Sequence, residues 1–421
     1  MAKADQTGAG TGQALEGLRV VEFAAALAGP WIGRIMAFCG AEVIRVESRK
    51  RPDVVRGYVP PWAPEMGVQP QLSPWFTDWN AGKRFVALDL TRPQALEISR
   101  RLVAACDVVI ENYSAGVMEK LGLGYSELHR VKPDVVMIST SGYGDRGPHH
   151  RYITWGPNIE ALSGLSNLSG FPGRECTMTQ YAYPDTLSAL HGLFAVMCAL
   201  DHRSRTGEGQ YISLSQTEAT IAVIGDVMME YLANGREPQS LGNRSLHAAP
   251  HGCYRCKGED RWCAVAVFGE AEWKSFCEVL GHLEWLIDPR FSNLSSRLQN
   301  AEVLDELIAH WTAGRTDYEV MSALQGAGVA AGVVQNTEDQ LKRDPQLADR
   351  EFFEEVPHLK KGSVIAAGIP VGLTATPGRS GPAGAAVGED NEYVFGELLG
   401  MTREEIRRAV DAGAIEVSEE R

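Results

Sequence analysis

The stretch that decides the fold is LRVVEFAAALAGPWIGRIMAFCGAEVIRVE, residues 18–47. The apolar run at 18–23 is typical of a buried strand, a helical pattern follows at about 30–38, and a second strand-like run occupies 42–47. A strand, a helix and a second strand in this order form the unit that joins parallel strands of one sheet.

The alternation continues along the chain. Further strands are predicted at 84–90, 107–110, 135–139 and 210–214, and helices at about 91–105, 186–202 and 216–232. Thr91-x-x-Gln94 and Thr402-x-x-Glu405 have the pattern of capping boxes and predict helix starts. The 186–202 segment is apolar almost all round, so we expect a buried helix. The pattern therefore predicts an α/β fold with a mainly parallel sheet.

Composition limits the function. The 421 residues are 44% hydrophobic, enough for two domains, and the net charge of −14 argues against nucleic acid and anionic membranes as partners. Residues 1–13 lack the basic and apolar regions of a signal peptide, and the longest apolar run, 187–200, is too short to span a bilayer. Eight scattered cysteines fit a reducing compartment, so we expect a cytoplasmic protein.

A possible zinc site lies at Cys253-Tyr-Arg-Cys256, with Cys263 and His251 nearby. The segment also has the pattern of a β-hairpin that turns near 258–260. Residues three apart in a strand point to opposite faces, so Cys253 and Cys256 would diverge. The sequence favours the hairpin, and we predict no metal site.

A Gly-x-Gly-x-x-Gly motif stands at 142–147 after a predicted strand. A dinucleotide-binding loop requires a helix that begins inside the motif, whereas here Pro148 and two histidines follow. The motif therefore favours a tight surface loop over a nucleotide-phosphate loop.

A basic run follows the second predicted strand and consists of Arg45, Arg49, Lys50, Arg51 and Arg56. Near strand ends, such a cluster is suited to the phosphates of a nucleotide-bearing ligand. The alternative is a solvated loop.

Asp185 stands at the start of the apolar helix, in Tyr183-Pro184-Asp185-Thr186. Aspartate is a preferred helix N-cap, so the carboxylate has a structural alternative to a role as a nucleophile.

Many ordered motifs together resemble the class III (CaiB/BaiF-type) coenzyme A transferases, which include formyl-CoA transferase. They cover nearly the whole chain and comprise LEGLRVVEF at 15–23, LAGP at 27–30, GAEVIRVE at 40–47, NAGKR at 80–84, DVVIENY at 107–113, LGLGY at 121–125, SGYGDRGP at 141–148, TGEGQ at 206–210, DPRF at 288–291, DPQL at 344–347 and LLGM at 398–401.

The resemblance implies an interlocked dimer in which a Rossmann-like large domain is combined with a smaller α+β domain. It places the N-terminal part of the large domain at 1–220, a linker at 221–250, the small domain at 251–335, and a second linker with the return to the large domain at 336–421. The active site would lie between subunits of a homodimer, or of a heterodimer with a paralogue.

The resemblance also implies the chemistry. Asp185 matches the family's catalytic aspartate, which attacks an acyl-CoA and passes CoA to a free carboxylic acid through aspartyl anhydride and aspartyl-CoA intermediates. CoA is then a substrate, with no permanently bound cofactor. We expect an ordinary pKa of about 3.9 for this aspartate. The residues matched to CoA contacts are Ala26, Leu27, Arg49, Asn112, Tyr113 and Lys120.

Departures from the family leave three alternatives open. Ser48 and Ser141 stand where formyl-CoA transferase has basic residues, which argues against oxalate or formate as the acid. Trp155-Gly156-Pro157-Asn158 replaces a segment that reads Tyr-Asp in many relatives, so a larger aryl or dicarboxylic acid such as benzylsuccinate or mesaconate is expected. The related 2-methylacyl-CoA racemases carry a histidine in the segment occupied here by Trp155-Gly156, which disfavours racemase activity. The third alternative is a non-catalytic subunit of a heteromeric enzyme, against which the intact Asp185 argues.

Overall fold

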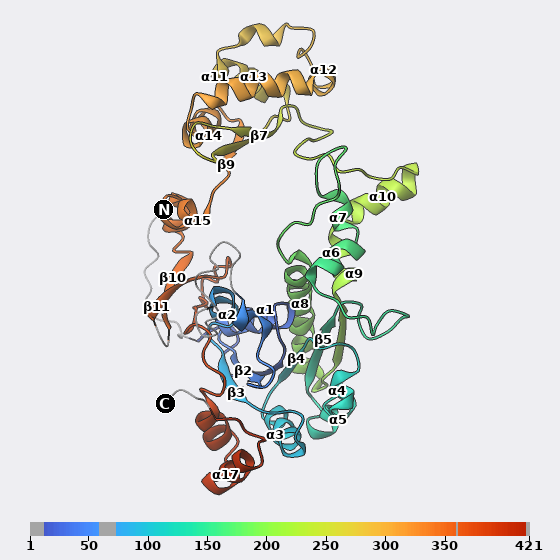
Figure 1. Cartoon of the computed structure of the whole chain (residues 1–421), viewed down its shortest axis with the longest axis vertical. Coiled ribbons are helices and arrows are strands. Elements are labelled where there is room, and N and C mark those ends of the chain that lie inside the picture. Colours follow the sequence, from blue (N-terminus) through green and yellow to red (C-terminus); the bar gives the residue numbers. More distant parts are fainter. Residues whose placement is uncertain (1–11, 59–72, 359–360, 418–421) are drawn as a thin grey trace. The chain divides into compact units, whose positions relative to one another are not determined.

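The computed structural model describes residues 12–58, 73–358 and 361–417 (Figure 1). The N-terminal stretch examined for a signal peptide lies mostly outside these ranges. The chain forms two compact units, the first made of Met1–Leu165, Thr179–Met229 and Ala348–Arg421, and the second of Ser166–Met178 and Glu230–Leu347. The division into domains at 220, 250 and 335 remains a prediction.

A six-stranded sheet with the order β3-β2-β1-β4-β5-β6 forms the centre of the first unit, and every neighbouring pair is parallel. The strands are β1 (Arg19–Phe23), β2 (Glu42–Glu47), β3 (Arg84–Ala87), β4 (Val108–Glu111), β5 (Val136–Ser141) and β6 (Tyr211–Ser215). The predicted α/β fold is confirmed, and each strand expected from the sequence is present.

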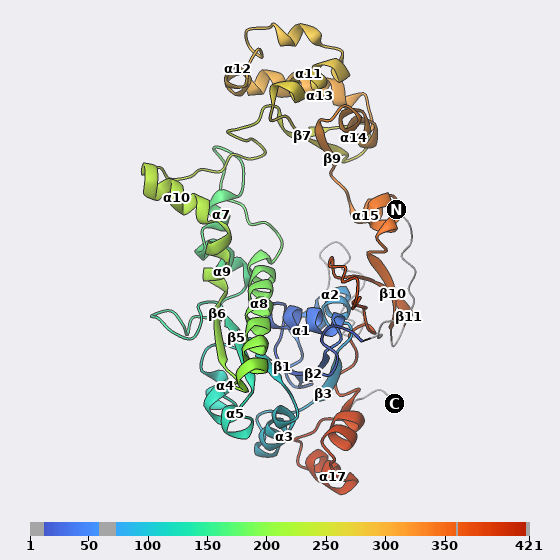
Figure 2. The same cartoon turned by 180° about the vertical axis from the view of Figure 1, so that it is seen from behind.

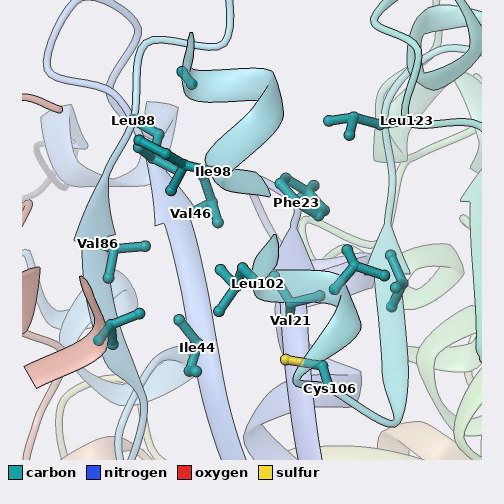
Figure 3. Close-up of a cluster of buried hydrophobic side chains, with 14 of the residues drawn as sticks. Val21, Phe23, Ile44, Val46, Val86, Leu88, Ile98, Leu102, Cys106 and Leu123 are labelled. Carbon is teal, nitrogen blue, oxygen red and sulfur yellow. The ribbon is translucent and has the colours of Figure 1, made fainter. Parts of the chain in front are cut away.

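Helices cover both faces of this sheet (Figures 1 and 2). One face packs against α1 (Ala28–Phe38) and α8 (Tyr183–Thr206), and the other against α3 (Pro93–Ala104), α5 (Tyr125–Val131) and α17 (Arg403–Asp411). Figure 3 shows side chains of the second face, where Val21, Ile44 and Val86 from three strands meet Ile98 and Leu102 of α3. Burial on both faces explains why the central strands are rich in apolar residues, whereas the edge strand β6 is only partly buried.

The remaining elements of the first unit are short. They are η1 (Val54–Gly57), α2 (Pro74–Trp79), α4 (Val117–Lys120), α6 (Gly156–Leu162), α9 (Gln216–Val223), the antiparallel pair β10 (Phe353–His358) and β11 (Gly362–Ala367), and the π-helix η4 (Glu392–Leu398). Three helices cross the boundary between the units: α7 (Leu165–Leu168), α10 (Gly225–Asn234) and α16 (Pro345–Asp349).

Three local predictions were wrong. Helix α3 has Arg92 as its N-cap, because Thr91 donates its hydroxyl to Asp89 instead of capping. The helix expected at 216–232 is interrupted at Ile224. Helix α8 is not buried all round, since one stripe of apolar side chains is exposed. The capping box at Thr402 is confirmed.

The second unit combines an antiparallel sheet with helices. The sheet has the order β7-β8-β9, with β7 (His251–Arg255), β8 (Trp262–Ala266) and β9 (Ala330–Val333). The helices are α11 (Glu270–Leu280), η3 (Leu283–Leu286), α12 (Leu294–Gln299), α13 (Ala301–Ala313), α14 (Asp317–Gly326) and α15 (Thr337–Lys342).

The predicted hairpin at 251–266 is confirmed by the pairing of β7 with β8. Cys256 and Cys263 pack in the hydrophobic core, whereas Cys253 pairs with Ala264, whose side chain lies on the other face of the sheet. Within the described ranges, no group of three or more His, Cys, Asp or Glu side chains is placed to hold a metal ion. None of the helices in those ranges is long and apolar enough to cross a membrane.

Candidate active site

The residues matched to CoA contacts gather at the carboxyl edge of the parallel sheet. Strand order reverses between β1 and β4, and open α/β sheets bind ligands at such a switch point. Ala26 and Leu27 follow β1, and Asn112 and Tyr113 follow β4. The topology therefore gives a physical reason, separate from the resemblance, for a ligand at these residues.

Hydrogen bonds fix the loop after β1 in one conformation. The Ala25 N–H donates to Asn112 Oδ1 at 2.8 Å, and Asn112 Nδ2 donates to the Ala25 carbonyl oxygen at 2.7 Å. Ala26 has a φ of 58°, in the left-handed region, and its N–H donates to both carboxylate oxygens of Asp53 at 3.1 Å. Asp53 and Asn112 thus hold a backbone conformation that alanine rarely adopts.

Two members of the basic run belong to buried ion pairs. Arg45 is fully buried and bonds to Glu22 at 2.9 Å and to Asp53. Arg56 is also buried and bonds to Glu47 at 2.7 Å. The exposed cations of the run are Arg49, Lys50 and Arg51. Only these three are accessible to a phosphate.

The other candidate contacts differ in exposure. Arg49 is exposed just after β2, and its guanidinium donates to the Val417 carbonyl oxygen at 2.7 Å. Tyr113 packs against the core, and burial raises the pKa of its phenol to about 12. Lys120 is exposed at the end of α4. The structure brings Ala26, Leu27 and Asn112 together and places Arg49 and Lys120 at the surface.

Asp185 lies in the first turn of α8 but is not the N-cap. That position belongs to Ala182, and no side chain makes a capping hydrogen bond there. The capping role considered for Asp185 is therefore wrong. Ala182 packs against the buried cluster that contains Leu27, so the start of α8 lies close to the loop after β1.

Two neighbours define the surroundings of the Asp185 carboxylate. Gly156 begins α6, and a Cβ at this residue would lie 2.8 Å from Asp185 Oδ2. Gln216 begins α9, is buried, and forms a side-chain hydrogen bond with the carboxylate. The carboxylate therefore lies between the starts of three helices.

Desolvation raises the pKa of Asp185 to about 6, while hydrogen bonds from Gln216 and from its own backbone N–H act in the opposite direction. The ordinary pKa expected from the sequence is wrong because partial burial removes part of the hydration of the carboxylate. At pH 7 about nine in ten of these carboxylates are still ionised. The group is thus charged at neutral pH yet more basic than an exposed aspartate, which suits a nucleophile.

The glycine loop at 142–147 contacts the start of α9, which carries Gln216. The Gly142 carbonyl oxygen accepts the Thr217 N–H at 3.1 Å and the Thr217 hydroxyl at 2.8 Å. A Cβ at Gly142 would lie 2.0 Å from Thr154 Oγ1, so only glycine fits. No helix begins inside the motif, as expected from Pro148, but the loop lies only partly at the surface, because Gly142 and Gly144 are buried. The loop fixes α9, and with it Gln216, to the end of β5.

Sequence reasoning missed Gln216 and Gly156 as site residues. Gln216 directly follows β6, and the rule that ligands bind at the carboxyl ends of parallel strands was sufficient to identify it. Gly156 owes its importance to its close approach to Asp185, 29 positions away, for which the sequence carries no local signal.

Known proteins with similar sequences and structures share this architecture. A family model described as CoA-transferase family III matches residues 15–391. The succinyl-CoA–D-citramalate CoA-transferase of Chloroflexus aurantiacus is 30% identical over 392 residues, which cover 93% of this chain and 96% of the relative. The succinyl-CoA:mesaconate CoA-transferase of Haloarcula hispanica is 31% identical over 368 residues, which cover 86% of this chain and 91% of that relative.

Among solved structures, a CaiB/BaiF family protein from Brucella suis superposes with a TM-score of 0.83 at 29% identity, and the match covers 92% of this chain and all of that one. The range matched by the family model reaches into both units and contains positions 156, 185 and 216 of this chain. The chain therefore belongs to CoA-transferase family III and is a CoA-transferase.

Proposed function

We propose that this enzyme moves CoA from succinyl-CoA to a second dicarboxylic acid, with Asp185 as the covalent nucleophile. The observation that carries the proposal is the desolvated Asp185 carboxylate, beside Gly156 and Gln216 and close to the loop at Ala26 and Leu27. A carboxylate in such surroundings has raised basicity and is partly shielded from water, which would protect an anhydride intermediate.

The reaction then has four balanced steps. The Asp185 carboxylate attacks the thioester carbonyl, which expels CoA thiolate and leaves an aspartyl anhydride. The thiolate attacks the aspartyl carbonyl, which releases the donor acid and forms aspartyl-CoA. The acceptor carboxylate displaces CoA thiolate to form a second anhydride, and the thiolate attacks its acyl carbonyl. The products are a new acyl-CoA and free Asp185, so no metal or ATP is required.

Gly156 favours this reaction over racemisation. In the related racemases this segment carries a histidine that acts as a base. In this chain Gly156 lies against the Asp185 carboxylate instead, and the neighbouring Trp155 is 54% exposed. Glycine has no side-chain group that could transfer a proton. We place the reacting carbonyl beside Asp185, where the racemases have their histidine.

The relatives support a dicarboxylic acid as the acceptor. The two relatives described above are named for succinyl-CoA with D-citramalate or mesaconate, which are dicarboxylic acids. Among the aryl and dicarboxylic acids expected from the sequence, these names favour short dicarboxylic acids. The second carboxylate would need a cationic or hydrogen-bonding partner in the assembled site.

We further propose a homodimer. The exposed stripe on α8 consists of Leu190, Phe194 and Met197, with exposed fractions of 49, 72 and 39%. These side chains recur with helical spacing, and a contiguous apolar patch of this kind marks a protein interface. A second copy would cover the helix that carries Asp185, in agreement with the interlocked dimer implied by the resemblance.

The reaction type is tested by isotope exchange. Purified protein is incubated with succinyl-CoA and a panel of labelled acids, including mesaconate, citramalate and benzylsuccinate, and a 2-methylacyl-CoA is incubated separately in deuterated water. We expect label to enter the acyl-CoA pool and no deuterium to enter the α-carbon. Deuterium uptake without acid exchange would establish a racemase instead. If neither activity is detected, the chain is a non-catalytic subunit.

The pH dependence tests the assignment of Asp185. Because the ionised form attacks, kcat/KM should be level above about pH 7 and fall tenfold per pH unit below about pH 6, the pKa of the carboxyl. Gln216→Leu removes a hydrogen bond that lowers this pKa, so the acidic limb should move to higher pH. Gln346→Leu, an exposed change in α16, serves as the control. A profile identical in wild type and Gln216→Leu would contradict the assignment.

A further inference from the structure

The Glu416 carboxylate occupies an anion site at the carboxyl end of β2. Ser48 Oγ donates to Glu416 Oε1 at 3.1 Å, and the Arg49 N–H donates to Oε2 at 2.6 Å. The Arg49 guanidinium reaches the next residue of the same segment, Val417, at its carbonyl oxygen. A backbone N–H, a hydroxyl and a guanidinium in one place are donors that proteins use for phosphate.

The fold holds Glu416 in this position. Its N–H donates to the Ala87 carbonyl oxygen at 3.1 Å, and the Asn391 side chain donates to its carbonyl oxygen at 2.9 Å. The preceding residue, Ile415, is buried and forms a β-bridge with Leu88. The C-terminal segment therefore runs beside the end of β3 and presents its carboxylate to Ser48 and Arg49.

The surroundings of this site are cationic. Lys50 and Arg51 are exposed next to Arg49, although the chain as a whole carries a net charge of −14. Lys50 pairs with Asp89 at 2.5 Å, and the two arginines beside it give the loop a net positive charge. A ligand that ends in phosphates, as CoA does, would be drawn to this loop, where one carboxylate is already bound.

We propose that Glu416 competes with a phosphate group of CoA for Ser48 and Arg49, so that the C-terminal segment sets the affinity for CoA. The proposal rests on the proposed function, because it needs CoA at the carboxyl edge of the sheet. We assign the 3′-phosphate to this site, since it is the terminal anion of CoA. The analogue 3′-dephospho-CoA lacks this group and therefore tests the assignment. The competition breaks no covalent bond.

The test is Glu416→Gln in the full-length protein. The amide keeps the size of the side chain and one acceptor but removes the charge. Dissociation constants of CoA and of 3′-dephospho-CoA are measured by calorimetry at low and high salt. Glu404→Gln, which neutralises an exposed carboxylate on α17, is the control. CoA should bind about three- to tenfold more tightly to Glu416→Gln at low salt, dephospho-CoA should be unchanged, and salt should reduce the difference.

Three results would overturn the inference: unchanged CoA binding, weaker CoA binding, or equal tightening of both ligands. Failure of the proposed function has a different signature. If wild type transfers CoA through a trapped Asp185 adduct while Glu416→Gln has no selective effect, only the competition by Glu416 is wrong. If wild type binds neither form of CoA, both proposals fail.

Discussion

Replacement of Asp185 by alanine should slow CoA transfer by at least about 10⁴-fold, because the chain then lacks the carboxylate that carries the acyl group and CoA in turn. The loss should appear in kcat, with KM for succinyl-CoA changed much less, since the loop at Ala26 and Asn112 is untouched. In wild type incubated with succinyl-CoA, borohydride or hydroxylamine should trap an adduct on the peptide that contains Asp185, detected by mass spectrometry.

Asp185→Asn separates chemistry from folding. The pKa of this carboxyl is raised from 3.8 to about 6, so between these pH values the carboxyl is mostly protonated in the folded state and mostly ionised in the unfolded state. The unfolded state therefore binds fewer protons between these two pH values, and Asp185 makes the fold less stable as pH rises through that window. The neutral asparagine removes this cost, so the variant should melt no lower than wild type at pH 7.5 while remaining inactive. Near-normal transfer by Asp185→Ala would contradict the covalent mechanism.

The sequence was sufficient to predict the sheet. Most of its strands are largely apolar and buried, whereas the edge strand β6 (YISLS) is only partly buried, so periodicity and spacing located β1 to β6 without reference to distant contacts. The prediction failed for α8, because an apolar helix surface looks the same whether it is covered by its own chain or by another. Phe194 and Leu190 are exposed in this chain, and the sequence contains nothing that distinguishes the two cases.

The candidate site was predictable in part. Ala26 and Asn112 follow parallel strands, so their neighbourhood could be expected from topology. Arg45 looked like a ligand-binding cation because it stands in a basic run, but its partners, Glu22 and Asp53, are met across strands and loops. The raised pKa of Asp185 also could not be foreseen, since desolvation depends on what three separate helices bring together.

Gly156 and Asp185 meet in one of these long-range approaches, and Gly156→Ala should lower kcat by about 100-fold, the loss that a misplaced reacting group commonly causes. A Cβ at this residue would lie 2.8 Å from Asp185 Oδ2 and 3.4 Å from the Ala182 Cβ. Real Cβ atoms essentially never approach another heavy atom to 2.8 Å, whereas 3.4 Å is an ordinary contact, so the carboxylate must rotate or α6 must move away from α8.

The backbone of Gly156 is outside the left-handed region, so alanine is acceptable there apart from this contact. Gly225→Ala is the matched control, because Gly225 begins α10 with open space around its Cα and the same methyl group is added. We expect Gly225→Ala to retain wild-type kcat, whereas Gly156→Ala keeps the KM for succinyl-CoA, the melting temperature and the acid selectivity but loses rate and accumulates less trapped adduct. A Gly156→Ala enzyme with wild-type kcat would show that the reacting carboxylate does not need the space beside Gly156, and the placement of the acyl carbonyl there would have to be abandoned.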